Sequence, residues 1–334
     1  MDEVLKIIND IKSGNIKPIY LLMGEEPYYI DKLSEYIEKS ILTEEEKGFN
    51  QTVLYGRDVT IEDIVGTAKR YPMMADRQVV IVKEAQDLVK TIDKLESYAE
   101  NPMPSTVLVV CYKYKTIDKR KKLLKSISKT GVVFESKKMY DNQVGQWITR
   151  VLQGKGLTIE PKANAILVDF LGNDLSKISN ELEKLQIILP KGSTITAKLI
   201  EENIGFSKDF NNFELLNALG SKNQVKAYQI VQYFSENEKA NPIVLTTSAV
   251  FNFYVKLLKY HGLKDKNPKN VAAVLGVHPF FLKDYDTGLK NYPMKKVSAI
   301  VTTLRSFDVK SKGVGANALP SHDLYKELLV GIFN

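Results

Sequence analysis

The chain has 334 residues, of which 44% are hydrophobic and 26% charged, and its formal net charge is +7. This composition is typical of a soluble globular protein and leaves enough apolar residues for two or three domains. It contains no apolar run of the roughly 18 residues that a membrane span needs, and its first residues form an amphipathic pattern rather than a secretory signal. The single cysteine, Cys111, excludes an internal disulfide, so we expect a cytoplasmic protein with no membrane partner.

The first 140 residues alternate short β-branched runs with segments of helical spacing. The predicted strands are Ile19–Met23, Thr52–Tyr55, Gln78–Val82, Thr106–Cys111 and Val132–Glu135. The predicted helices cover 1–14, Tyr28–Leu42, Thr60–Lys69, Thr91–Glu100 and Asp118–Lys129. Strands of near-continuous apolar character, separated by helices, predict a parallel sheet that is covered on both faces. This part of the chain is therefore expected to be an α/β domain.

After about residue 140 the pattern predicts helices and no further strands. These helices are Gln143–Leu152, Pro161–Leu171, Leu175–Leu189, Ala197–Ile204, Gln224–Ser235, Pro242–His261, Lys269–Leu275, Pro279–Asn291, Met294–Val309 and His322–Phe333. A break at 205–213 separates the first four of them from the rest. We expect three domains: an α/β domain (1–140), a small helical domain (141–208) and an all-α domain (209–334).

The turn after the first strand is a place where many α/β proteins bind nucleotide phosphates. A P-loop has the pattern G-x-x-x-x-G-K-[ST], in which glycine amides and a lysine approach the phosphates. Counted from Gly24, the second glycine, the lysine and the hydroxyl residue are replaced by Tyr29, Ile30 and Asp31. Lys83 follows the third strand, where an ATPase needs a metal-binding carboxylate. The sequence therefore predicts a degenerate site that holds no nucleotide.

No other motif indicates catalysis. His261, His278 and His322 are far apart and lack metal-ligand spacing with Cys111. Neither the nucleophile motif G-x-S-x-G nor the zinc motif H-E-x-x-H occurs. We expect no catalytic residue, no metal and no cofactor.

Four segments give the chain a family resemblance: IYLLMGEEPYYIDKL, RQVVIVKEA, DKRKKLLKSI and GNDLSKISNELEKL. Their order resembles the delta subunit family of the bacterial DNA polymerase III clamp loader. The resemblance implies an AAA+-like α/β domain, a helical lid and a helical collar that holds the other loader subunits. It implies a protein that binds the sliding clamp and favours its opening for loading on primed DNA, while other subunits hydrolyse ATP. Enzyme activity would then come only from the DNA polymerase holoenzyme that the subunit serves.

The resemblance also implies a clamp-binding element of two bulky apolar residues before the third strand. In this chain it comprises Tyr71, Pro72, Met73 and Met74, with Arg77 beyond. Pro72 ends the preceding helix, and two thioether side chains suit a hydrophobic pocket on a partner. In the alternative interpretation both methionines turn inward and pack beneath the helix.

Closely spaced positive charges make a second candidate site. Residues 112–140 hold 10 Lys and Arg against 2 Asp and Glu, and residues 209–334 hold 16 against 10. The candidate DNA-binding residues are Lys119, Arg120, Lys121 and Lys122. Such a cluster neutralises phosphates without reading bases. The alternative is a solvated helix face whose charges pair with acidic neighbours.

Two functions of other classes stay open at this point. One is an active AAA+ ATPase such as a helicase loader, which the altered turn at Gly24–Asp31 disfavours. The other is a plain DNA-binding protein that retains the α/β fold only as a scaffold. A delta-prime subunit is disfavoured because its cysteine-rich zinc module needs more than one cysteine. Lys177, where AAA+ ATPases place a phosphate-sensing arginine, also argues against hydrolysis.

Overall fold

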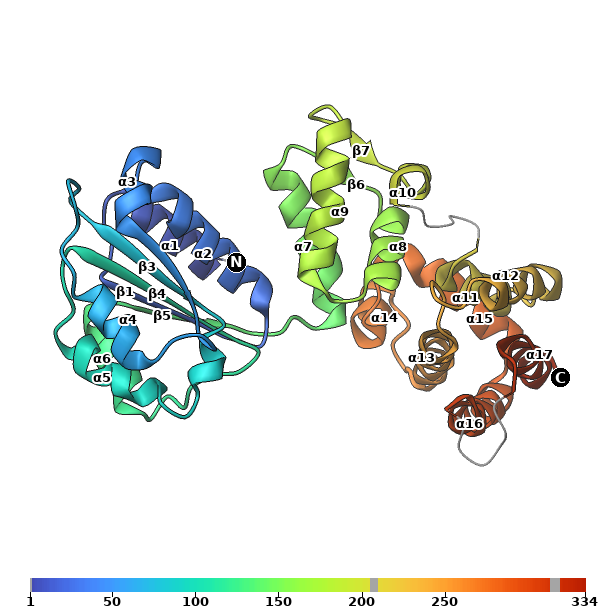
Figure 1. Cartoon of the computed structure of the whole chain (residues 1–334). Coiled ribbons are helices and arrows are strands. Elements are labelled where there is room, and N and C mark those ends of the chain that lie inside the picture. Colours follow the sequence, from blue (N-terminus) through green and yellow to red (C-terminus); the bar gives the residue numbers. More distant parts are fainter. Residues whose placement is uncertain (1, 205–209, 313–318) are drawn as a thin grey trace. The chain divides into compact units, whose positions relative to one another are not determined.

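The computed structural model describes residues 2–204, 210–312 and 319–334 (Figure 1). The chain forms two compact units, residues 1–139 and 140–334. Within the described part of the chain, no helix combines the length and apolar character of a membrane span.

The first unit is built on a five-stranded parallel sheet of order β2-β3-β4-β1-β5. Its strands are β1 (Ile19–Gly24), β2 (Gln51–Tyr55), β3 (Gln78–Lys83), β4 (Thr106–Lys113) and β5 (Val132–Ser136). The helices are α1 (Asp2–Lys12), α2 (Pro27–Ser40), α3 (Glu44–Asn50), α4 (Ile61–Ala68), α5 (Glu96–Glu100) and α6 (Lys122–Thr130), with 3₁₀ turns at Ala85–Leu88 and Ile92–Leu95. All five predicted strands are confirmed.

Alternation along the strands divides the core of this unit into two layers. Leu21 and Leu108 lie in one apolar cluster with side chains of α4, α5 and α6. Leu22 and Val109 lie in the other with side chains of α1 and α2. Successive side chains of a strand point to opposite faces, so central strands must be apolar throughout. The predicted α/β domain with both faces covered is therefore confirmed, and Figure 1 shows the two helical layers.

Three details of the first unit differ from the sequence prediction. The helix expected over Thr91–Glu100 is a 3₁₀ turn followed by the short α5, and the helix expected from Asp118 begins at Lys122. Helix α3 was not predicted at all. It is only seven residues long, too short to display a periodic apolar face.

The second unit is mostly helical. Its first elements are α7 (Asp141–Gly154), α8 (Pro161–Leu171), α9 (Leu175–Ile188) and α10 (Ala197–Ile204). These are followed by α11 (Asn212–Gly220), α12 (Gln224–Glu236), α13 (Ile243–Gly262), α14 (Pro268–Leu275), α15 (Leu282–Asn291), α16 (Met294–Ser311) and α17 (Ser321–Phe333), with a 3₁₀ turn at Pro279–Phe281 before α15. One large apolar cluster joins α11 to α17.

The expectation that strands end at residue 140 was wrong. β6 (Thr158–Ile159) and β7 (Thr194–Ile195) pair in parallel in the second unit. Two residues are too few to produce the alternation by which a strand is recognised in a sequence. Helix α11 was also missed, because the predicted break at 205–213 overlaps its start. Residues 205–209, including the predicted boundary between 208 and 209, lie outside the described residues, so the three-domain division stays a prediction.

Candidate functional site

The segment 69–77, between α4 and β3, is anchored at its base by buried polar side chains. The side-chain nitrogen of Gln78, Nε2, donates hydrogen bonds to the carbonyl groups of Ala68, at 3.3 Å, and of Arg70. It also donates to the Thr106 hydroxyl at 2.8 Å, and that hydroxyl donates to the Ala68 carbonyl at 2.8 Å. The last carbonyl groups of a helix need such partners. The end of α4 is thereby bonded to the first residues of β3 and β4.

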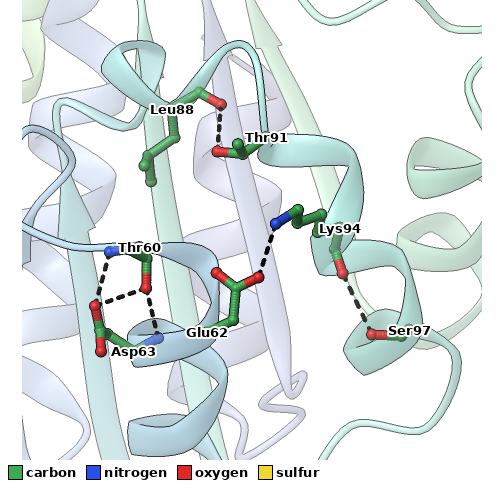
Figure 2. A network of polar contacts seen from close by, with 7 residues as sticks. All are labelled: Thr60, Glu62, Asp63, Leu88, Thr91, Lys94 and Ser97. Carbon is green, nitrogen blue, oxygen red and sulfur yellow. Dashed lines mark hydrogen bonds and ion pairs between the residues drawn. The ribbon is translucent and has the colours of Figure 1, made fainter.

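The beginning of α4 is held equally firmly (Figure 2). Thr60 and Asp63 form a capping box, in which the Thr60 amide donates to the Asp63 carboxylate at 2.9 Å and the Asp63 amide donates to the Thr60 hydroxyl at 3.2 Å. The Lys94 ammonium lies 2.9 Å from the Glu62 carboxylate. Hydrogen bonds from Thr60 and Lys94 lower the pKa values of Asp63 and Glu62, respectively. Helix α4 is thus a fixed support for the segment that follows it.

The tip of the segment points its apolar side chains into solvent. Tyr71 is 79% exposed, Met73 61% and Met74 103%. Met74 has a φ of 53°, in the left-handed region that non-glycine residues avoid at a cost of roughly 1–2 kcal/mol. The structure contradicts the alternative in which both methionines pack inward beneath the helix. A strained, exposed thioether pair needs surrounding contacts that fix the backbone.

Asn50, the last residue of α3, provides those contacts. Its side-chain oxygen accepts a hydrogen bond from the Met73 amide at 2.6 Å, and its side-chain nitrogen donates to the Met73 carbonyl at 2.9 Å. The same nitrogen donates to the Glu46 carbonyl at 3.1 Å. Asn50 is only 4% exposed, whereas its neighbour Phe49 is 75% exposed. The loop tip is therefore joined to α3 by a paired hydrogen bond.

The sequence analysis missed Asn50 and Phe49 together with α3. A signal was present, because Thr43 and Glu46 match the capping-box pattern S/T-x-x-E. In the structure the Thr43 amide donates to the Glu46 carboxylate at 2.9 Å, and the Glu46 amide donates to the Thr43 hydroxyl at 3.4 Å.

The degenerate phosphate turn is closed by the chain itself. α2 begins at Pro27, three residues after Gly24, so Ile30 lies inside the helix and is fully buried. The buried Glu26 carboxylate accepts a hydrogen bond from the Tyr28 amide at 3.0 Å. A helix N-terminus attracts anions because its amides lack partners. Here the Glu26 carboxylate caps the start of α2.

Gly24 has a structural reason to be glycine. Its φ is 140°, and a Cβ at this position would lie 1.9 Å from the Ser136 carbonyl oxygen. The Glu26 amide donates to that oxygen at 3.3 Å. The close approach between the turn and β5 therefore requires glycine at this position.

A lysine fills the space beside this turn. The Lys113 ammonium, at the end of β4, lies 2.7 Å from the Asp31 carboxylate and 3.0 Å from the Glu84 carboxylate. Burial alone would lower the pKa of Lys113, but the hydrogen bonds and charges of Asp31 and Glu84 raise it above its usual range. Asp31, at the predicted P-loop hydroxyl position, thus belongs to an internal ion cluster. The arrangement fits neither a magnesium ion nor a phosphate.

The basic candidates beside α6 are mostly paired with acidic residues. Nitrogen–oxygen distances of 2.6 Å join Lys119 to Glu135, Arg120 to Asp118 and Lys121 to Asp93. The hydrogen bond from Arg120 lowers the pKa of Asp118 to about 2. Lys122 is exposed and has no acidic partner in the described part of the chain. These contacts match the alternative of a solvated helix face whose charges are paired, and Lys122 is the exception among the four candidates.

The other candidates from the sequence offer no chemistry. Burial raises the pKa of the Cys111 thiol to about 11, so it is an inert core residue. Lys177 pairs with Asp174 at 3.3 Å, and His261 hydrogen-bonds to the Tyr292 carbonyl at 2.8 Å. Among the described residues no group of three or more His, Cys, Asp and Glu side chains has the arrangement of a metal site.

Two family models match this chain. The model of the DNA polymerase III delta subunit matches residues 20–137, and the model of that subunit's C-terminal domain matches residues 209–322. The chain belongs to the DNA polymerase III delta subunit family. The second match covers the third of the chain in which the sequence motifs were weakest.

Individual relatives agree with this family. DNA polymerase III subunit delta of Bacillus subtilis (strain 168) is 26% identical over 319 residues, which cover 92% of each chain. The probable DNA polymerase III subunit delta of Aquifex aeolicus (strain VF5) is 22% identical over 309 residues, covering 88% of this chain and 86% of the relative. The structure of the Bacillus subtilis DNA clamp loader delta protein shares the fold, with a TM-score of 0.56, 24% identity and 99% coverage of both chains. The family models and these relatives thus agree on the DNA polymerase III delta subunit family.

Proposed function

We propose that this delta subunit binds the sliding clamp through Tyr71, Pro72, Met73 and Met74 and favours opening of the ring. The observation that carries the proposal is the exposure of Met73 and Met74 on a backbone that Asn50 holds by two hydrogen bonds. An exposed, fixed apolar tip is unfavourable in a free protein unless a partner covers it. A hydrophobic pocket on the clamp is such a partner.

The energy available from this tip is enough for a specific contact. Complete burial of one methionine side chain contributes on the order of 1.5–3 kcal/mol before ordering costs are subtracted. Because Met73 is fixed by Asn50 in the free chain, little backbone entropy is lost when a partner binds. Two methionines together then account for roughly 3 kcal/mol of net binding energy, or about 100-fold in affinity.

The subunit is proposed to hydrolyse no ATP. A bound phosphate would have to displace the Glu26 carboxylate from the start of α2, and a magnesium ion would have to displace Lys113 from between Asp31 and Glu84. An active ATPase of the helicase-loader type is disfavoured by both contacts. ATP would be bound and hydrolysed by other loader subunits.

The remaining partners belong to the assembled loader in the cytoplasm. Helices of residues 209–334 are proposed as the collar that holds other subunits, and those of 141–208 as the lid. Exposed apolar side chains on the collar support this role: Val225, Tyr228, Val244, Leu245 and Val274. Primed DNA is proposed to contact Lys122 and the paired Lys119, Arg120 and Lys121 only after assembly, because their acidic partners weaken binding by the chain alone.

The test is binding of the purified chain to its cognate sliding clamp. We expect the Met73→Ala/Met74→Ala double variant to bind at least about 30-fold more weakly while its thermal unfolding is unchanged, because both side chains are exposed. Met294→Ala, which removes an exposed methionine from the second unit, is the matched control and should bind like the wild type. If the double variant binds as tightly as Met294→Ala, the clamp contact lies elsewhere. A folded wild-type chain with no affinity for the clamp would overturn the proposal.

A further inference from the structure

The exposed tip of segment 69–77 is joined to a second exposed apolar side chain. Asn50 hydrogen-bonds to both the amide and the carbonyl of Met73, and Phe49 precedes Asn50 on α3. Phe49 is 75% exposed, although it is a large aromatic residue in a helix whose buried residue is Asn50. We propose that the last turn of α3 is a second element of the clamp-binding surface, in which Asn50 positions Met73 and Met74 and Phe49 adds an aromatic contact. This inference rests on the proposed clamp contact of the two methionines.

The hydrogen-bond distances place Phe49 within the area that one partner covers. Neighbouring Cα atoms are about 3.8 Å apart, and the Asn50 side chain touches the Met73 backbone directly. The Cα atoms of Phe49 and Met73 are therefore within roughly 12 Å of each other. A standard interface covers about 800 Å² on each partner, which corresponds to a disc of about 30 Å across. A disc of that size centred on Met74 extends beyond the position of Phe49.

Aromatic residues at interfaces contribute more than their number suggests. They bury a large rigid area at a small loss of side-chain entropy, and they are enriched among the residues that dominate binding energy. The two methionines are flexible and adapt to a pocket. Phe49 would supply the rigid contact that a methionine pair lacks, and its position on α3 rather than on the loop makes that contact independent of loop motion.

Asn50 acts on the same surface without being part of it. It is buried, so it cannot be covered further by a partner. Both of its bonds to Met73 are needed to hold the exposed backbone before Met74, whose φ is positive. A loop that samples other conformations would bind more weakly in proportion to the fraction that remains competent. Asn50 is thus a positioning residue for the clamp contact.

The experiment measures clamp affinity and methionine amide exchange in the full chain. Phe49→Ala should weaken binding about 10-fold and leave thermal unfolding unchanged, whereas Phe280→Ala, which removes an exposed phenyl group from the second unit, should bind like the wild type. Asn50→Ala should weaken binding about 5- to 10-fold and should have no further effect in the Met73→Ala/Met74→Ala background. Asn50→Asp retains the acceptor for the Met73 amide but sets a carboxylate oxygen against the Met73 and Glu46 carbonyl groups, so it should also weaken binding.

A spectroscopic measurement separates positioning from general destabilisation. The chain has seven methionines, so selective ¹⁵N-methionine labelling gives few signals. In Asn50→Ala the Met73 amide should exchange with solvent at least about 10-fold faster, while Met23, buried in β1, should keep its protection. If Met23 also loses protection, the clamp affinities of Phe49→Ala and Asn50→Asp decide whether the last turn of α3 belongs to the clamp-binding surface.

The outcomes distinguish this inference from the proposed function. Normal binding by Phe49→Ala, together with unchanged Met73 exchange in Asn50→Ala, would overturn the inference, and the clamp contact of the methionines would stand if their double variant still loses affinity. Normal binding by that double variant would instead overturn the contact site itself.

Discussion

Replacing Lys113 by methionine tests whether Lys113, Asp31 and Glu84 form an ion cluster that stabilises the first unit. The Lys113 ammonium contacts Asp31 at 2.7 Å and Glu84 at 3.0 Å, and its side chain is 12% exposed. Methionine retains most of the apolar stem and removes only the charge. Two carboxylates would then face each other across a partly buried space with no cation between them.

The expected loss is about 2 kcal/mol in the free energy of unfolding of the first unit. Breaking a fully buried ion pair costs roughly 3–5 kcal/mol. The side chains of Asp31 and Glu84 are 45% and 35% exposed, so water screens part of that loss. The remaining value is in the range of a charged hydrogen bond. It corresponds to an approximately 30-fold rise in the equilibrium constant for opening.

The chain carries one natural probe in each unit. Cys111, two residues before Lys113, is buried in the sheet, so its reaction with a thiol reagent reports opening of the first unit. Trp147, the single tryptophan, is buried in α7, so its fluorescence reports the second unit. We expect Cys111 labelling to accelerate about 30-fold in Lys113→Met, while the Trp147 unfolding transition stays where it is.

A control and the pH dependence sharpen this test. Lys83→Met removes the longer 3.4 Å pair with Glu38 and should cost less than about 1 kcal/mol. The pKa of Lys113 is raised, so its contribution is complete below about pH 10 and is lost only at higher pH. On the acid side burial opposes ionisation of Glu84, but hydrogen bonds from Gln86 and Lys113 lower its pKa, so the contribution is lost as the pH falls below about 4. An effect no larger than that of Lys83→Met between pH 6 and 9 would refute the reasoning.

Three further substitutions have defined outcomes. Gly24→Ala forces a Cβ into the Ser136 carbonyl, so we expect a loss of more than about 3 kcal/mol, seen as insoluble expression or rapid thiol labelling, and normal stability would contradict this. Gln78→Ala leaves the last carbonyl groups of α4 without a buried donor and should cost about 1–3 kcal/mol by urea unfolding, with a loss under 0.5 kcal/mol counting against the anchor. Arg120→Ala should move the carboxyl titration of Asp118, followed by NMR, from about 2 up towards its ordinary value, and an unmoved midpoint would show that the pair does not persist in solution.

The parts of the fold that depend on periodic burial were predictable from the sequence. Each strand of the sheet is a short apolar run bounded by turn residues, and such runs read as strands because both faces are covered. The departure from the P-loop pattern was equally visible in the sequence, since it depends on which residues follow Gly24. Met73 and Met74 were found through the family resemblance, and their exposure needed the structure, because an apolar pair is buried more often than not.

The parts that depend on contacts distant in sequence were not predictable. Asn50 and Met73 are 23 residues apart, and neither shows by its type that it bonds to the other. The same holds for Lys113, which was counted with the basic run and is instead paired with Asp31 and Glu84. The three-dimensional fold brings these partners together. Sequence spacing alone had indicated only a loop at Met73 and a phosphate-binding surface around Lys113.

The Lys113 ion cluster and the exposed tip of segment 69–77 lie at opposite ends of the strands, so one can be fixed by ion pairs while the other stays exposed. In a parallel sheet all strands begin at one end of the sheet and finish at the other. Segment 69–77 leads into β3 at Gln78, whereas Glu84 follows its last residue and contacts Lys113 at the end of β4. A six-residue strand separates these two ends by about 20 Å. Changes this far apart with no shared partner are usually additive, so substitutions in the Lys113 ion cluster and in the tip of segment 69–77 should act independently of each other.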